Sequence, residues 1–311
     1  MGNIDKQAAK GAVEGYLGRS KSIFNESLLD IAEQKIVDLR SDKGFSFPTN
    51  EGMRKITKRP EIEKLDKDPS LSKLREIIRT TIDGVQNLKK GGLYVGVNAF
   101  HHGHLAYLSK SEAILAVDMN ELVPYGFAFI VGLTAGAKDP ESFKKQVSLL
   151  TTSPEKLRDF FEDTELGRTA LVQSDADEAQ FARKRLLTGL LSTLEEFNPK
   201  IHGQRKIPPV FCNDTDAYNY FRTLIVQDKV AGGIAKLQGK KLLGAIASAM
   251  DSFELALPQL NTLYVSSCFD PRFAGPKSRL KFLDDLRMKG FDNIQIVESF
   301  LNSGWIIYDV E

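Results

Sequence analysis

Two residues, Gly96 and Asp118, have the types and the spacing to hold a nucleotide-like ligand. Residues 91–98 form a predicted buried strand that enters a turn, and residues 113–118 form a second predicted strand that ends in the carboxylate of Asp118. A glycine in such a turn lets the backbone approach a ligand, and an acid at the second strand tip can accept hydrogen bonds from two ribose hydroxyls. The alternative is that the glycine only relieves backbone strain and the acid only caps the next helix.

Three of the four histidines follow this turn, at His101, His102 and His104. If a helix starts there, His101 and His104 share one face at a spacing that can bind a metal. No carboxylate or cysteine lies close in sequence, so we expect a polar helix start that faces the pocket and holds no metal. His102 is also a candidate general base, because an unperturbed imidazole has a pKa of about 6.5.

Other reactive groups lie farther along the chain. Cys268 and Asp270 follow a predicted strand at residues 262–266, whose carboxyl end would border the ligand crevice. Cys268 could act as a nucleophile beside a loop histidine, although a small buried thiol is the commoner outcome. Residues 211–216 lack the regular ligand alternation and the final glutamate of a calcium loop, so they are predicted as a turn or a helix cap.

The composition excludes several classes of partner. The 42 basic and 41 acidic residues of the 311 give a net charge of +1, which would not attract nucleic acid or an anionic membrane. Two cysteines favour a reducing compartment, and no apolar run is long enough for a membrane span. The start of the chain lacks the apolar core of a signal peptide. We therefore expect a cytoplasmic protein, or a bacterial effector that a dedicated machine exports.

The pattern of apolar residues predicts an α/β protein with helical additions. Residues 1–40 are expected to form a helical arm, and residues 41–311 an α/β domain that carries a helical insertion at about 139–200. Helix starts within the insertion are predicted at residues 139–141 and 153–155. A loop or lid is predicted at residues 41–70. The spacing of apolar residues also predicts further helices and strands. The expected apolar stripe of the arm comprises Ile23, Leu28, Ile31, Ile36 and Leu39. The other expected helices are 70–87, 125–133 and 275–289, and the later strands are 262–266, 293–297 and 305–310. The last two strands should be antiparallel, because their connector is short.

The runs at residues 92–97 and 113–118 resemble a bacterial family of methyltransferase-like proteins of mostly unassigned function. The segments 47–51 and 264–267 resemble two further motifs of that family, and the order agrees over about residues 45–131 and 230–310. The resemblance implies a Rossmann-like, class I methyltransferase-type sheet, mostly parallel with a C-terminal antiparallel hairpin.

The resemblance also implies a cofactor, S-adenosylmethionine, at the carboxyl ends of the central strands. Its implied binding residues are Asn50, Gly96, Asn98, Asp118 and Ser266. Candidate bases for the reaction are Glu51, His102 and Asp270. The chain departs from the family at Asn98, which replaces a second glycine, and near Gly232, where an adenine-reading acid is missing.

Two functions remain open from the sequence. The first is an S-adenosylmethionine-dependent transferase that moves a methyl group to a small molecule or a protein side chain. The second is a catalytically inactive protein that keeps the fold and binds a partner through its helical insertion, because fold does not fix function. The sequence does not define the acceptor or the oligomeric state.

Overall fold

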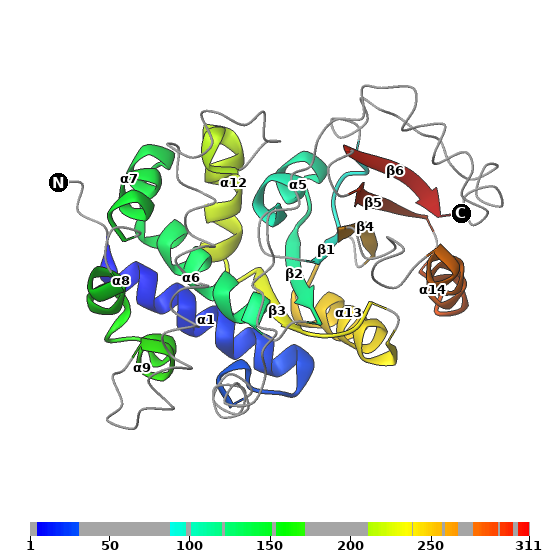
Figure 1. Ribbon diagram of the computed structural model, residues 1–311. Helices are drawn as coiled ribbons and strands as arrows, with labels where there is room; N and C mark the ends of the chain where they lie inside the picture. Colours follow the sequence, from blue (N-terminus) through cyan, green and yellow to red (C-terminus); the bar gives the residue numbers. More distant parts are fainter. Residues whose placement is uncertain are drawn as a thin grey trace.

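A single sheet of six strands, in the order β3-β2-β1-β4-β5-β6, organises the computed structural model of the chain (Figure 1). The structure describes residues 5–30, 88–97, 101–119, 122–150, 154–171, 211–237, 239–256, 259–266, 276–291, 293–300 and 304–310. The strands are β1 Leu93–Val97, β2 Ala113–Asp118, β3 Val230–Ile234, β4 Leu260–Ser266, β5 Ile294–Phe300 and β6 Gly304–Val310. Strands β1 to β5 are mutually parallel, and β6 pairs with β5 in the antiparallel direction.

Helices cover the two faces of the sheet in two separate groups. One face packs against α5 His102–Ser109, α6 Leu122–Gly136 and α12 Thr215–Val226, and the other packs against α13 Lys240–Ser252 and α14 Pro276–Met288. The chain therefore winds outward from β1 to β3 on one face and returns through β4 and β5 on the other. This is the α/β, Rossmann-like arrangement that the sequence predicted.

The central strands lie next to one another as predicted. Strand β1 pairs in parallel with β2 on one side and with β4 on the other, so residues 93–97, 113–117 and 262–266 are confirmed as neighbours. All residues of β1 and β2 are buried, as parallel strands covered on both faces require. Strand β4 begins at Leu260, earlier than predicted, because Leu260 already pairs with Leu93.

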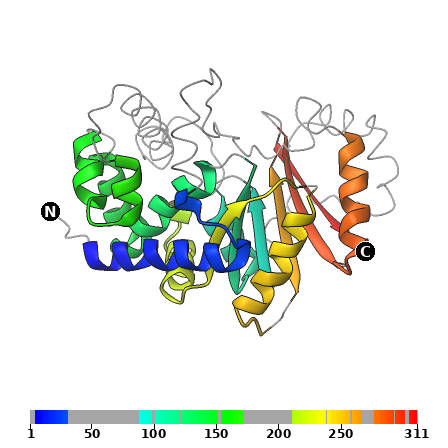
Figure 2. The same cartoon turned by 90° about the horizontal axis from the view of Figure 1, so that it is seen from below.

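The first helix, α1 Lys6–Phe24, covers the edge of the sheet at β3 (Figure 2). Its Ser20 hydroxyl accepts a 2.9 Å hydrogen bond from the Gly232 amide of β3 and donates a 2.6 Å bond to the Tyr16 carbonyl. An edge strand otherwise presents unpaired amides to other chains. The predicted N-terminal arm is thus an edge cover built into the α/β body over its described part.

Two adjacent glycines make that close approach possible. A side chain at Gly232 would overlap the Tyr16 hydroxyl, and one at Gly233 would overlap the Phe24 ring. Successive strand residues point to opposite faces of the sheet, so Tyr16 and Phe24 of α1 pack against β3 on its two faces.

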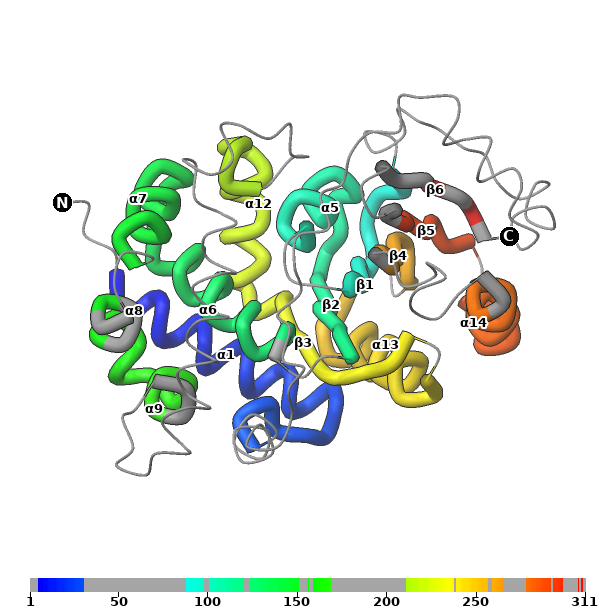
Figure 3. Tube along the Cα trace, viewed as in Figure 1, coloured from blue at the N-terminus to red at the C-terminus, as the bar shows by residue number. Residues whose placement is uncertain are grey.

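Helices α7 Pro140–Leu150, α8 Pro154–Phe161 and α9 Glu165–Leu171 form the described part of the predicted insertion. The starts at Pro140 and Pro154 are those predicted, and Asp139 caps α7 by accepting a 2.7 Å hydrogen bond from the Ser142 amide. The tube trace shows this block and β6 at opposite ends of the molecule (Figure 3). Residues 172–200, and the predicted elements within 31–87, lie outside the described residues.

Helix α6 is almost wholly buried, as the apolar run at 125–133 predicted. Among the described residues, no helix is both long and apolar enough to cross a membrane.

Candidate functional site

The carboxyl ends of β1, β2 and β4 meet at the point where the strand order reverses. In open α/β sheets this is where ligands bind, because the flanking helices lie on opposite faces and leave a crevice there. Asp118 is the last residue of β2, and Ser266 is the last residue of β4. Gly96 of β1 pairs with Ala116 on one side and with Tyr264 on the other. The structure therefore brings Gly96, Asp118 and the backbone of Ser266 to one edge, as predicted.

Asp118 lies at this edge with 8% of its surface exposed. It pairs with Ile234 of β3, and its carbonyl accepts a 3.0 Å hydrogen bond from the Ala235 amide. The next residue, Met119, is 70% exposed, so an apolar side chain lies beside the carboxylate at the strand end. A carboxylate and an apolar surface together are suited to a ribose and a planar base.

Gly96 packs against side chains of its own strand and of α5. A Cβ at this position would overlap the Tyr94 hydroxyl and the His102 ring, so those two side chains occupy the space beside the glycine. The glycine admits protein groups on the α5 face of the sheet. Gly96 itself therefore offers no open approach for the methionine portion of a cofactor on that face.

His101 and His102 are enclosed in the protein, with exposures of 1% and 0%. His102 Nδ1 lies 3.2 Å from the Tyr94 hydroxyl oxygen, and its ring meets Phe127 edge-on at 4.9 Å. The His101 ring meets Tyr264 edge-on at 5.8 Å. The expectation that these imidazoles face an open pocket is not met, since the strands and α6 enclose them.

Two tyrosines complete this buried group, which we call the imidazole–phenol cluster: Tyr94, His101, His102 and Tyr264. Burial, and then the neighbouring Tyr264, raise the pKa of Tyr94 well above its usual value. Tyr94 therefore stays a neutral phenol beside the His102 ring. Because His102 is fully buried, a substrate can reach it only if the surrounding side chains move.

His104 belongs to a different environment, where α5 packs against α12. It is 5% exposed, and its Nδ1 has no hydrogen-bond partner among the described residues. Burial lowers the pKa of His104 to about 4, although the nearby Asp214 acts in the opposite direction. Asp214 caps α12 by accepting hydrogen bonds from the Asp216 and Ala217 amides, at 2.8 and 3.0 Å, so the prediction of a helix cap is confirmed.

No group of three potential metal ligands is found within the part of the chain that the structure describes. The absence of a metal at the histidines therefore stays a prediction. Asn50, Glu51, Asn98 and Asp270 lie outside the described residues, as does Cys268, and only the backbone of Ser266 is described.

A protein-family profile with the description "Domain of unknown function (DUF7790)" matches residues 75–269, which is more than half of the chain. The chain belongs to this family. The DUF7790 match includes β1 to β4, and with them Gly96, His102 and Asp118, while α1, β5 and β6 lie outside it. A search of curated proteins finds no match to the chain.

A buried ion pair borders the DUF7790 region at the other side of the crevice. Arg279 of α14 and Glu298 of β5 are 1% and 0% exposed, and their paired atoms lie 3.0 and 2.6 Å apart. Glu298 pairs with Ser266, so this two-point contact ties α14 to the sheet near the end of β4. Sequence reasoning missed the pair, although a single glutamate within the apolar run of β5 was a signal of it.

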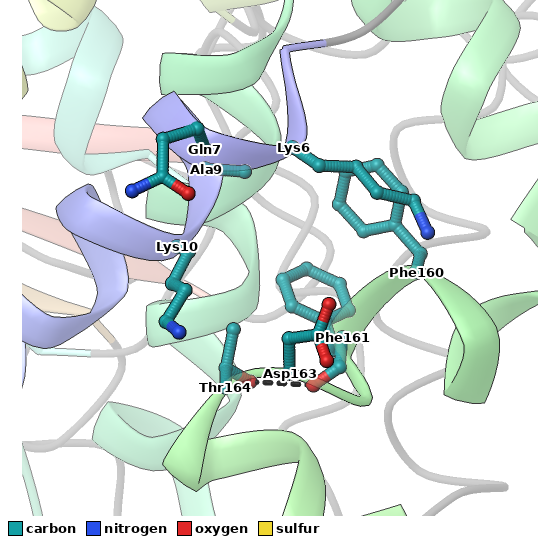
Figure 4. A pocket seen from close by; sticks show the side chains of 8 residues that line it. All are labelled: Lys6, Gln7, Ala9, Lys10, Phe160, Phe161, Asp163 and Thr164. Atoms are coloured by element: carbon teal, nitrogen blue, oxygen red, sulfur yellow. Dashed lines mark hydrogen bonds between the residues drawn. The ribbon is translucent and has the colours of Figure 1, made fainter.

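A small pocket lies away from this edge, between the start of α1 and the junction of α8 with α9 (Figure 4). It is lined by Lys6, Gln7, Ala9, Lys10, Phe160, Phe161, Asp163 and Thr164. Its volume of about 80 Å³ is far below the ~300 Å³ at which pockets for drug-sized ligands begin. The carboxyl ends of β1, β2 and β4 are therefore a better candidate for a ligand site than this pocket.

Proposed function

We propose that this chain binds S-adenosylmethionine at the carboxyl ends of β1, β2 and β4 and transfers the methyl group to a small molecule or a protein side chain. One observation carries the proposal: Asp118 ends β2 beside the reversal of strand order. An acid at that place in a doubly wound sheet can accept hydrogen bonds from the ribose hydroxyls of an adenosine group. The exposed Met119 supports it, because an adenine ring can pack against an apolar side chain.

The residues present fit this cofactor in part. Asp118 fits the ribose, whereas the space beside Gly96 is already filled by Tyr94 and His102. The methionine portion would therefore have to lie beyond the tip of β1, outside the face that the imidazole–phenol cluster fills.

The chemistry asks little of the protein beyond positioning. When bound, the cofactor supplies a methyl group on a sulfonium that an acceptor can attack in line. The chain would orient the acceptor, exclude water and supply a base only if the acceptor arrives protonated. His102 is enclosed and bonded to Tyr94, so Glu51 and Asp270 are the better candidates for a base that touches the acceptor.

A specific observation favours a second candidate, a partner-binding protein that has no cofactor. The glycine that would indicate a ligand, Gly96, is explained by packing against the protein's own Tyr94 and His102 side chains. In this case the strand ends have a structural role only, and the helical block of α7, α8 and α9 supplies the surface that contacts the partner.

Calorimetric titration of the purified protein with S-adenosylmethionine and with its demethylated product separates the two candidates. The transferase proposal expects saturable binding of both at micromolar to low millimolar concentration. If neither binds at millimolar concentration, while the protein is shown to be folded by circular dichroism, the partner-binding account is preferred.

A further inference from the structure

Two tyrosine rings hold a lysine ammonium where α5 and α12 lie side by side (Figure 1). Lys110 Nζ lies 3.6 Å from the centroid of the Tyr107 ring and 5.1 Å from that of Tyr220. The two rings meet edge to face, with centroids 5.8 Å apart and an interplanar angle of 65°. Both distances from Lys110 Nζ to a ring centroid are within the ~6 Å range of a cation–π interaction.

The backbone and hydrogen bonds fix this arrangement. The Tyr220 hydroxyl donates a 2.9 Å bond to the Ser111 carbonyl, which holds its ring beside the end of α5. Lys110 caps α5 in the left-handed conformation, with φ at 48°, and its amide donates to the Ala106 and Tyr107 carbonyls. The rings are therefore positioned by two helices, whereas the Lys110 side chain is exposed and joined to them by a flexible stem.

Charges of both signs surround the rings. Burial, and then the positive charge of Lys110, lower the pKa of Lys90, which bonds to the Leu108 carbonyl near the end of α5. Burial first, and then the negative charges of Asp214 and Asp216, raise the pKa of Tyr107, so its hydroxyl lies in a region of negative potential. The Tyr107 ring also meets the His104 ring, with centroids 6.1 Å apart, and the buried Nδ1 of this histidine has no partner among the described residues. A cation over the rings would thus gain from two carboxylates and from two π faces.

We propose that Tyr107 and Tyr220 form a binding site for the quaternary ammonium group of a small molecule, and that Lys110 occupies it when the ligand is absent. A quaternary ammonium needs no hydrogen-bond acceptor, so ring faces and nearby carboxylates meet its full requirement. The lysine is a weak occupant, because a cation–π contact at an exposed position changes an equilibrium constant only a few-fold.

This site is independent of the proposed cofactor site. Helix α5 begins beside the carboxyl end of β1 and ends at Ser109, shortly before the amino end of β2 at Ala113. The tyrosine pair therefore lies toward the amino ends of the strands, and a failure of either proposal leaves the other untouched.

Ligand-observed NMR with choline tests the proposal, with the neutral isostere that carries a tert-butyl group in place of the trimethylammonium as the comparison ligand. The variant Lys110→Asn removes the competing ammonium, and asparagine tolerates the left-handed backbone of residue 110. We expect this variant to bind choline at least about threefold more tightly than the wild type. The neutral isostere should bind more weakly than choline to the same variant.

Two further variants make the result specific. Adding Tyr107→Leu to Lys110→Asn should abolish choline binding, with circular dichroism as the check on folding. Lys138→Asn, at a lysine whose side chain is 78% exposed elsewhere on the surface, should leave the wild-type affinity unchanged. No choline binding to Lys110→Asn, equal binding of the isostere, or binding that survives Tyr107→Leu would each overturn the proposal.

Discussion

Tyr94 and His102 show how one small residue can serve packing at a place where a ligand was expected. Both side chains occupy the space that a Cβ of Gly96 would need, and both are fully buried. Their 3.2 Å contact satisfies two polar atoms inside an aromatic environment. The glycine is therefore required by the imidazole–phenol cluster, whatever binds at the strand ends.

Replacing Gly96 by alanine tests this role. The added methyl group forces Tyr94 or His102 to shift within a closely packed core, so we expect Gly96→Ala to lower the free energy of unfolding by about 1–3 kcal/mol. The control is Gly244→Ala on the exposed face of α13, where a Cβ meets nothing within 4 Å and helix propensity predicts a gain of up to ~1 kcal/mol. Urea unfolding measures both, and equal stabilities for the two variants would count against the packing role.

His104 should make the stability depend on pH. Its pKa is lowered to about 4 in the folded protein, against about 6.5 when unfolded, so the unfolded state binds more protons between these values. The contribution of His104 to the free energy of unfolding is therefore fully present above pH ~6.5 and is lost as the pH falls toward 4. Between pH 7 and pH 5 this loss is about 2 kcal/mol. His104→Leu should remove this part of the pH dependence. Thermal melts across that range measure it, and an unchanged slope in the variant would assign the dependence to other groups.

At the scale of elements, α1 covers the edge of the sheet at β3. Its Ser20 hydroxyl pairs with a backbone amide of the edge strand, and Tyr16 and Phe24 pack against Gly232 and Gly233. A two-sided grip of this kind protects an otherwise open sheet edge from pairing with other chains.

Ser20→Ala leaves the Gly232 amide buried without its partner. The loss of such a bond costs about 1–3 kcal/mol of the free energy of unfolding. Thr223→Ala is the matched control, because its exposed hydroxyl bonds only within α12, and surface changes usually stay within about 0.5 kcal/mol. Urea unfolding curves of both variants measure this cost. A Ser20→Ala protein as stable as this control would show that the amide finds another partner.

Local signals predicted the elements well, because each strand and helix start has its own pattern. The runs at β1, β2 and β4, the helix starts at Pro140 and Pro154, and the cap at Asp214 all follow from residues close in sequence. The environment of Gly96 did not follow, since it depends on Tyr94 and His102 meeting across a strand and a helix. The Arg279–Glu298 pair was missed for the same reason, because ion pairs between elements leave no periodic trace.

At the scale of the whole molecule, a double-wound sheet separates two possible ligand sites. Asp118 lies at the carboxyl ends of β1, β2 and β4. The tyrosine pair, Tyr107 and Tyr220, lies at the junction of α5 and α12, toward the amino ends of the strands. The helical block extends the molecule on the far side of α6, away from β6 (Figure 3). The DUF7790 match includes the central strands, so Asp118 lies within the part of the chain that the family shares.

Binding of S-adenosylmethionine to wild type, Asp118→Asn and Asp251→Asn, measured by titration calorimetry, tests the central claim most directly. Asparagine keeps the shape of the side chain but removes the charge that strengthens the ribose hydrogen bonds, so Asp118→Asn should bind about tenfold more weakly. Asp251→Asn, at an exposed acid of α13, should bind as the wild type does. Equal affinities for all three proteins, or no binding to the folded wild type at millimolar concentration, would contradict the assignment of Asp118 as the ribose-binding residue.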